Sequence, residues 1–111
     1  MIEQPAKEEV LSIIKEIEAN PAATQRAVSD KLGISLGKTN YLLRELILKG
    51  FIKSRSFTNN PGKLKKIQYL LTEKGMEEKF RLLKHFLRIK EAEYNELKHE
   101  MEQSLNGKTG T

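Results

Sequence analysis

The feature that most constrains this chain is a pair of segments with helical apolar periodicity that meet at one glycine. Thr24 is a suitable N-cap for the first segment, and Gly33 ends it with a residue that adopts a left-handed backbone at little cost. Two residues later, Ser35 can cap a second helix that extends through Lys49 to a stop at Gly50. The residues predicted to face inward are Ala27, Val28 and Leu32 in the first helix, and Thr39, Leu42, Leu43, Leu46 and Ile47 in the second. The two helices are therefore predicted to share one core across a tight turn.

A third helix and a β-hairpin are predicted on either side of this pair. The helix extends from near Pro5 to Asn20-Pro21, because a proline suits a first turn and the apolar residues recur on one face. After the pair, residues 51–57 and 67–71 are rich in strand-forming side chains. The intervening TNNPGKLKK combines turn residues with three lysines. These strands are therefore predicted to form a hairpin with a basic tip, here called the wing.

A last helix, the longest, is predicted after the hairpin. Thr72 can cap it, Gly75 is a weak point in its first turn, and Asn106-Gly107 is its predicted stop. The chain is therefore predicted to be mainly α-helical with a small β-hairpin. Its predicted parts are a winged helix-turn-helix domain over residues 1–72, a long helix over 73–105 and a disordered tail over 106–111.

Composition limits the classes of protein to which this pattern can belong. With 111 residues, of which 38% are hydrophobic and 32% charged, the chain can form one small domain with a helical extension. The absence of cysteine excludes a disulfide framework, a thiolate zinc site and a cysteine nucleophile. No apolar run approaches the roughly 20 residues that cross a bilayer, and no secretory signal opens the chain. We therefore expect a cytoplasmic protein that makes no contact with a membrane.

The positive charge of the chain is concentrated in its middle. Residues 24–72 carry ten basic and two acidic side chains, a net charge of +8, whereas the preceding residues carry two basic and five acidic ones. From residue 73 onward, eight basic and eight acidic side chains cancel. Such a concentration beside neutral and acidic flanks is typical of a module that binds a polyanion. The charge pattern, together with the paired helices, predicts double-stranded DNA as a partner.

The second helix of a helix-turn-helix places its first turns in the major groove of DNA. Lysine and arginine can bond guanine there, asparagine can make a paired contact with adenine, and tyrosine can reach a phosphate or pack on a thymine methyl. An ordinary solvated helix face is the alternative, but an exposed tyrosine and glycine in an early turn are unusual choices for solubility alone. The predicted base-reading residues are Leu36, Gly37, Lys38, Asn40, Tyr41 and Arg44.

Backbone phosphates have two predicted binding regions. The first comprises the openings of the two paired helices, where the dipole is positive, although simple capping is the alternative. Its residues are Thr24, Gln25, Arg26 and Ser35. The second is the wing, which is predicted to lie along or in the minor groove, with a merely solvated loop as the alternative. The predicted wing residues are Arg55, Asn59, Asn60, Lys63, Lys65 and Lys66.

The long helix carries an apolar stripe that such a small domain cannot cover. A helix of this length extends about 50 Å. Its apolar residues follow one another at alternating steps of four and three, interrupted once by Lys90. A homodimer through this helix is predicted, and a helix folded back on its own core is the alternative. The predicted dimer contacts are Leu83, Leu87, Tyr94, Leu97 and Met101.

Patterns for catalysis or metal binding are not evident in the sequence. His85 and His99 lie fourteen residues apart on one predicted helix, about 21 Å, so they cannot share a metal within one chain. The segment LGKT at 36–39 resembles the end of a phosphate-binding loop but lacks its upstream glycine and follows no strand. We therefore expect a protein that is not an enzyme and has no cofactor and no metal site.

The run NPAATQRAVSDKLGISLGKTNYLLRELILKGFIK, with the hairpin, LTEKG and the long helix, resembles winged-helix regulators of the MarR type. The chain is most similar to the small MarR-like regulators associated with bacterial exopolysaccharide loci. This resemblance covers about residues 5 to 105 and implies a bacterial transcription factor that binds promoter DNA as a homodimer. It implies a recognition helix from Ser35 to Arg44. The wing departs from the family, because it has NNPG where an aspartate-arginine pair is often found, and no small-molecule effector can be assigned.

Together these features predict a sequence-specific, dimeric transcriptional regulator, and specifically a repressor that occludes a promoter. Two-fold symmetry would place the two recognition helices about 34 Å apart, which predicts an inverted repeat with half-sites one helical turn apart. The alternative is a protein-interaction adaptor whose winged helix docks an acidic partner. Glu45, within the proposed recognition helix, gives that alternative some support.

Overall fold

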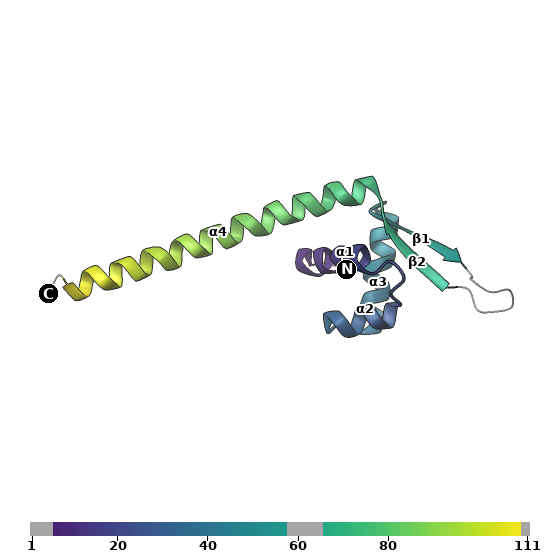
Figure 1. Ribbon diagram of the computed structural model, residues 1–111, viewed down its shortest axis with the longest axis horizontal. Coiled ribbons are helices and arrows are strands. Elements are labelled where there is room, and N and C mark those ends of the chain that lie inside the picture. The colour runs from purple at the N-terminus through teal and green to yellow at the C-terminus, as the bar shows by residue number, and fades with distance from the viewer. Residues whose placement is uncertain (1–5, 58–65, 110–111) are drawn as a thin grey trace, which may run out of the picture. The chain divides into compact units, whose positions relative to one another are not determined.

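The computed structural model describes residues 6–57 and 66–109 and divides into two compact units, which are described separately. In chain order the elements are α1 (Lys7–Ala19), α2 (Gln25–Leu32), α3 (Leu36–Leu48), β1 (Ile52–Phe57), β2 (Lys66–Leu71) and α4 (Glu73–Thr109) (Figure 1). The first unit extends to Phe80 and so contains five elements and the opening turns of α4, and the second contains the rest of α4. The predicted fold class, mainly α with a small hairpin, is confirmed.

The turn between α2 and α3 forms as its capping residues predict. Thr24 Oγ1 accepts a hydrogen bond from Ala27 N at 3.0 Å, and Ser35 Oγ accepts one from Lys38 N at 3.0 Å. Gly33 ends α2 with a φ of 69°, the left-handed conformation that glycine adopts without a steric penalty. Local sequence signals therefore determine both the position and the tightness of this turn.

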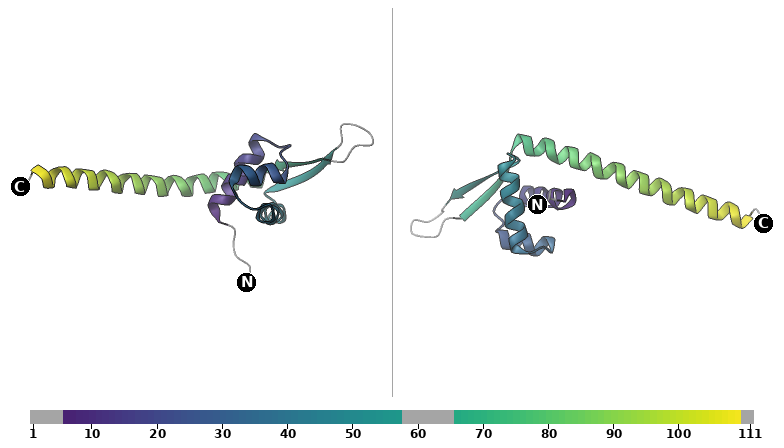
Figure 2. Two further views of the ribbon diagram at one scale, coloured as in Figure 1. Left: turned by 90° about the horizontal axis from the view of Figure 1, so that it is seen from below. Right: turned by 180° about the vertical axis from the view of Figure 1, so that it is seen from behind.

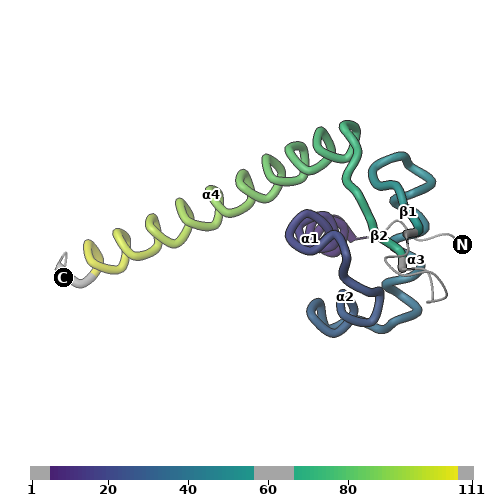
Figure 3. The backbone as a smooth tube through the Cα atoms, turned by 45° about the vertical axis from the view of Figure 1, so that its right-hand side comes forward, coloured from purple at the N-terminus to yellow at the C-terminus, as the bar shows by residue number. Residues whose placement is uncertain are grey.

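The core of the first unit lies where three helices meet the hairpin (Figures 2 and 3). α1 contacts α2 and β2, and α3 contacts α2 and β1. α1 ends at Ala19, beside its predicted stop, whereas its predicted start near Pro5 lies outside the described residues. α3 ends at Leu48, one residue earlier than predicted, with Lys49 as its C-cap. The side chains of the core are all at most 5% exposed, and they are Ile13, Ile17, Val28, Leu42, Leu43, Leu46, Ile52 and Tyr69.

Two residues that the sequence predicts to face inward are exposed instead. Ala27 is exposed on α2, and the buried residues of this helix are Val28 and Ser29. On α3, Leu46 is buried but Ile47 keeps 36% of its surface exposed. Each short helix buries only the side that touches its neighbours. Ala27 and Ile47 lie about 100° round the helix from Val28 and Leu46, beyond the edge of that buried side.

The hairpin is a two-stranded antiparallel sheet in which Ile52 pairs with Leu71. Phe51, the first residue of the predicted strand, precedes β1, and β2 begins at Lys66, one residue earlier than predicted. The tip of the hairpin, residues 58–65, lies outside the described residues. The structure thus confirms the strands of the hairpin and their pairing, apart from single-residue differences at their ends.

The backbone carbonyl of Phe51 fixes the start of α4. Its oxygen accepts a hydrogen bond from Thr72 N at 3.0 Å and lies 3.0 Å from the Thr72 hydroxyl. Thr72 Oγ1 in turn accepts a hydrogen bond from Gly75 N at 3.0 Å, which confirms Thr72 as the N-cap. A Cβ at Gly75 would lie 2.0 Å from the same Phe51 oxygen. Gly75 is therefore not a weak point of α4 but the residue that permits this close packing.

The C-terminal end of α4 differs from the prediction. The helix continues to Thr109, past Asn106-Gly107 and through most of the stretch predicted as a disordered tail. A glycine inside a helix costs only about 1 kcal/mol relative to alanine, and no proline follows that would remove a helical hydrogen bond. The stop signal is therefore too weak to end a helix of this length, while residues 110–111 lie outside the described part of the chain.

We expect Gly75→Ala to lower the free energy of unfolding by about 2 kcal/mol, because the added methyl group must displace the Phe51 carbonyl or the first turn of α4. The matched control is Gly107→Ala, whose added carbon meets nothing within 4 Å and should raise stability by up to about 1 kcal/mol. Urea denaturation followed by circular dichroism measures both variants. A Gly75→Ala variant as stable as the wild type would contradict the close contact.

Candidate nucleic-acid interface

One side of α3 is packed into the core, and the opposite side is open. Thr39 is fully buried and donates its hydroxyl hydrogen to Ser35 O at 2.9 Å. All the predicted base-reading residues are exposed, and the two large apolar ones, Leu36 and Tyr41, keep 43% and 38% of their surface exposed. The structure thus brings the following six residues together on the outer side of one helix: Leu36, Gly37, Lys38, Asn40, Tyr41 and Arg44.

Lys38 is held in an ion pair rather than extended freely from α3. Its Nζ lies 2.7 Å from Glu9 Oε2 of α1, and the two side chains are 50% and 22% exposed. A partly exposed ion pair of this kind stabilises a protein by only about 0–1 kcal/mol. The pair therefore links α3 to α1 but can be exchanged for another anion at small cost.

Gln25, a predicted phosphate-binding residue at the start of α2, contacts side chains of two other elements. Its Nε2 donates to the Tyr69 hydroxyl at 3.1 Å and lies 3.5 Å from Asn40 Oδ1. The amide of Gln25 therefore connects the hairpin to the outer side of α3. Sequence reasoning did not include Tyr69 in the site, although a tyrosine within a strand that packs on a core signals a hydroxyl in need of a partner.

The remaining predicted phosphate-binding residues lie at the openings of α2 and α3. The hydroxyls of Thr24 and Ser35 accept hydrogen bonds from the backbone, so both residues are caps, and each hydroxyl keeps its own hydrogen to donate. Arg26 is exposed in the first turn of α2. These positions combine the positive ends of two helix dipoles with a cation, which is an arrangement that favours anions.

Only part of the predicted wing is described. Arg55 is exposed on β1, where it pairs in register with Gln68. Lys66 is the first residue of β2. The other predicted wing residues lie outside the described residues, and they are Asn59, Asn60, Lys63 and Lys65.

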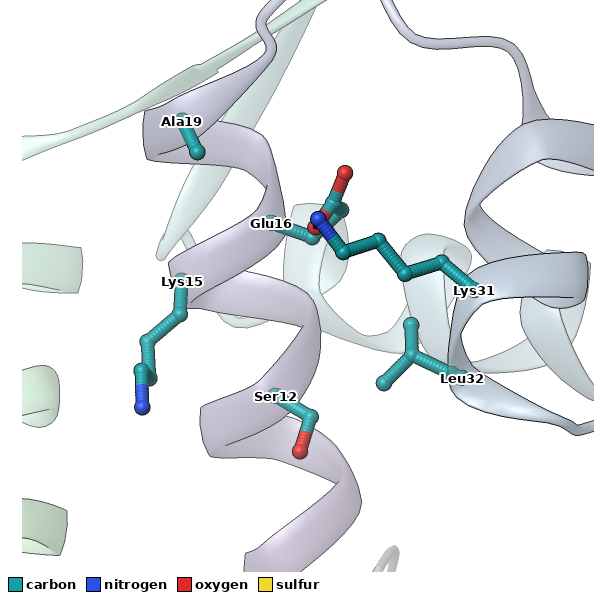
Figure 4. A pocket seen from close by; sticks show the side chains of 6 residues that line it. All are labelled: Ser12, Lys15, Glu16, Ala19, Lys31 and Leu32. Atoms are coloured by element: carbon teal, nitrogen blue, oxygen red, sulfur yellow. Dashed lines mark ion pairs between the residues drawn. The ribbon is translucent and has the colours of Figure 1, made fainter.

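An open cavity of about 390 Å³ lies between α1 and α2 (Figure 4). Lys31 reaches from α2 to Glu16 of α1, with its Nζ 3.2 Å from Oε2. The hydrogen bond that Asn20 Nδ2 donates to Glu16 Oε1 at 3.0 Å, followed by the contact with Lys31, lowers the pKa of the Glu16 carboxyl below its ordinary value. This ion pair therefore stays charged at neutral pH and fastens α1 to α2. The other lining residues are Ser12, Lys15, Ala19 and Leu32.

The second unit is a single helical segment with a row of exposed apolar side chains. Its most exposed large apolar residue, Leu97, keeps 66% of its surface accessible. Lys90 interrupts the row and pairs with Glu93, with Nζ 3.5 Å from Oε2. All the residues predicted to form dimer contacts are exposed, and they are Leu83, Leu87, Tyr94, Leu97 and Met101.

Within 6–57 and 66–109, no helix combines the length and the apolar character that a bilayer span needs. No three His, Asp or Glu side chains of these ranges are grouped as ligands of one metal ion would be. His85 is half-buried and His99 exposed on α4.

Residues 10–53 match the family described as winged helix-turn-helix DNA-binding. This segment contains most of α1, all of α2 and α3, and every predicted base-reading residue. A comparison with curated proteins finds no significant match. Residues 10–53 are therefore similar to winged helix-turn-helix DNA-binding domains.

Solved structures of similar fold include MarR-family regulators. A mutant of S. aureus MepR is 17% identical, with a TM-score of 0.66 over 88% of this chain and 74% of that chain. S. aureus MepR in a complex with DNA is 17% identical, with a TM-score of 0.60 over 93% and 78% of the two chains. Lactococcus lactis ZitR, a zinc-responsive MarR family member, is 24% identical, with a TM-score of 0.58 over 86% and 62%. At these identities the likeness concerns the fold.

Proposed function

We propose that this chain is a sequence-specific transcriptional regulator of the MarR type that binds double-stranded DNA as a homodimer in the bacterial cytoplasm. The observation that carries the proposal is the open outer side of α3, which presents five exposed side chains and Gly37 to a base edge within a segment that matches a DNA-binding family. The dimer would repress transcription by occluding an inverted repeat in a promoter. The resemblance to regulators of exopolysaccharide loci makes polysaccharide biosynthesis genes the proposed targets.

Shape and charge of the first unit support this function. A Cβ at Gly37 would meet nothing within 4 Å, so no neighbouring atom of the described chain demands a glycine on the outer side of α3. A bound duplex would require a glycine there, because the absence of a side chain lets the backbone of α3 approach a base edge. The net charge of +8 over residues 24–72 supplies the attraction for phosphates.

The exposed row on the second unit supports a homodimer. Apolar residues that alternate at steps of three and four form the seam of a two-helix coiled coil. Burial of such large side chains stabilises association by about 1.5–3 kcal/mol each before the costs of ordering are subtracted. A second copy of the same helix offers the matching seam, and its two-fold symmetry fits two half-sites on DNA.

A protein-interaction adaptor that docks an acidic partner would use the same positive surface. Glu45, the acidic residue that supports this alternative in the sequence, is half-buried in the structure. Its side chain is therefore less accessible to a partner than the exposed residues on the outer side of α3. The matching DNA-binding segment favours DNA over an acidic protein as the partner.

We expect the full chain to select an inverted repeat from randomised duplexes and to retain it at about 0.15 M salt with excess nonspecific competitor. If about six phosphates are neutralised per dimer, the logarithm of affinity should fall against the logarithm of salt with a slope near −5. Replacing Lys63, Lys65 and Lys66 with alanine should weaken all duplexes alike and flatten that slope. Fluorescence anisotropy measures each quantity. If excess competitor abolished binding of the selected duplex, the result would favour the adaptor.

Breaking the ion pair between α1 and α3 should strengthen DNA binding. We expect Glu9→Gln to raise the affinity for DNA up to about fivefold. Lys38 would no longer have to leave the Glu9 carboxylate before it contacts DNA, and breaking that ion pair costs at most about 1 kcal/mol. The matched control is Glu8→Gln, which removes the same charge from an exposed neighbour on α1. An equal gain in both variants, measured by titration of the selected duplex, would show that only net charge matters.

Charged substitutions in the exposed row of α4 should separate the dimer. We expect Leu97→Glu combined with Met101→Glu to give monomers, because four like charges would then face each other across the seam. Such monomers should bind the selected inverted repeat more weakly than the wild type. Asn95→Glu with Gln103→Glu adds the same charge outside the row and should leave a dimer. Analytical ultracentrifugation distinguishes these results, and a dimeric Leu97/Met101 variant would place the interface elsewhere.

A further inference from the structure

Tyr69 of β2 holds its hydroxyl in a fixed place beside α2. The residue is 5% exposed within the core, and its backbone N–H donates to Pro21 O at 3.1 Å. A buried tyrosine hydroxyl needs a hydrogen-bond partner. That partner is Gln25, whose Nε2 lies 3.1 Å from the hydroxyl oxygen. Since the ring and backbone of Tyr69 are both anchored, the hydroxyl holds the Gln25 Nε2 that it contacts in a defined place.

The Gln25 amide extends this chain of contacts to the outer side of α3. Its Nε2 also lies 3.5 Å from Asn40 Oδ1. An amide nitrogen carries two hydrogens and is not an acceptor, so it can meet Asn40 only through an oxygen. A flipped Asn40 amide would place its Nδ2 against Nε2, a donor against a donor. The contact therefore directs Oδ1 of Asn40 toward Gln25 and leaves Nδ2 on the other side.

We propose that Tyr69 and Gln25 are positioning residues for base reading and that they set the amide of Asn40 for a paired contact with adenine. The inference rests on the proposed function, because Asn40 reads a base only in a DNA complex. In the paired contact, Oδ1 accepts a hydrogen bond from adenine N6 while Nδ2 donates to N7. Oδ1 has two lone pairs, so it can accept from Gln25 and from adenine together.

A fixed amide selects a base more strictly than a free one. An asparagine that rotates freely can present its donor and its acceptor in either order, whereas the contact of Oδ1 with Gln25 Nε2 favours one of the two orders for Asn40. The contact between Gln25 and Asn40 is exposed and long for a hydrogen bond, so its part in holding the fold together is small. Its effect is on the orientation of the Asn40 amide. Tyr69, the buried member of this row of three contacting residues, holds Gln25 in place.

The experiment compares two duplexes for each variant. The first is the inverted repeat that the wild-type chain selects from randomised duplexes. The second is the same repeat with a different base pair at the position where the wild type prefers A·T and Asn40→Ala shows no preference. Fluorescence anisotropy gives Kd for each, and their ratio is the discrimination. We expect Tyr69→Phe, which removes one oxygen atom, to reduce this ratio about 3- to 10-fold, the effect of one hydrogen bond. Affinity for an unrelated duplex should stay the same.

A matched control separates orientation from stability. Ser29→Ala removes a buried hydroxyl from α2, and this hydroxyl donates a hydrogen bond to Arg26 O at 3.1 Å. It should lower the free energy of unfolding, as measured by urea denaturation, without changing the discrimination ratio. Within an Asn40→Ala background, Tyr69→Phe should reduce the ratio no further, because the side chain that it positions is gone.

The outcomes distinguish this inference from the proposed function. An unchanged ratio in Tyr69→Phe, or an equal reduction in Ser29→Ala, overturns the inference while the function stands. A selected site at which no base pair depends on Asn40 overturns it as well. A wild-type chain that selects no duplex sequence contradicts the proposed function itself.

Discussion

The packing of one side of α3 into the core is the interaction on which the rest of the first unit depends. Leu42, Leu43 and Leu46 are each at most 2% exposed, and burial of each stabilises the fold by about 1.5–3 kcal/mol relative to exposure. Because these residues and Thr39 occupy one side of the helix, the residues between them are forced outward. The outer side of α3 is thus defined by the core before any partner is considered.

Local chemistry made much of this arrangement predictable. The caps Thr24 and Ser35 and the left-handed Gly33 act within four residues of their own positions, so the sequence alone was enough to place α2 and α3. The outward direction of the base-reading residues followed from the 3.6-residue period. Ile47 was predicted wrongly because periodicity gives the direction of a side chain but not the width of the face that its neighbours cover.

Contacts between distant parts of the chain were not predictable in the same way. The ion pair of Lys38 with Glu9 and the contact of Gln25 with Tyr69 join residues on different elements, and no local pattern encodes which polar side chains will meet. Gly75 is a similar case, because its requirement comes from the Phe51 carbonyl rather than from the helix that contains it. Such features depend on how the elements pack, which single-sequence patterns do not specify.

Tyr69 connects the core of the first unit to the candidate base-reading residues. Its backbone N–H is hydrogen-bonded to Pro21 in the loop before α2, its ring belongs to the core and its hydroxyl contacts Gln25, so a shift of β2 against α2 would disrupt at least one of these contacts. Phosphate contacts position a protein on DNA, and base contacts specify the sequence. In the proposed complex, phosphate contacts bring Asn40 to the correct base only if the strands of the hairpin and Asn40 keep a fixed geometry. The hydrogen bond of Tyr69 with Gln25 of α2, and the contact of Gln25 with Asn40, support that geometry.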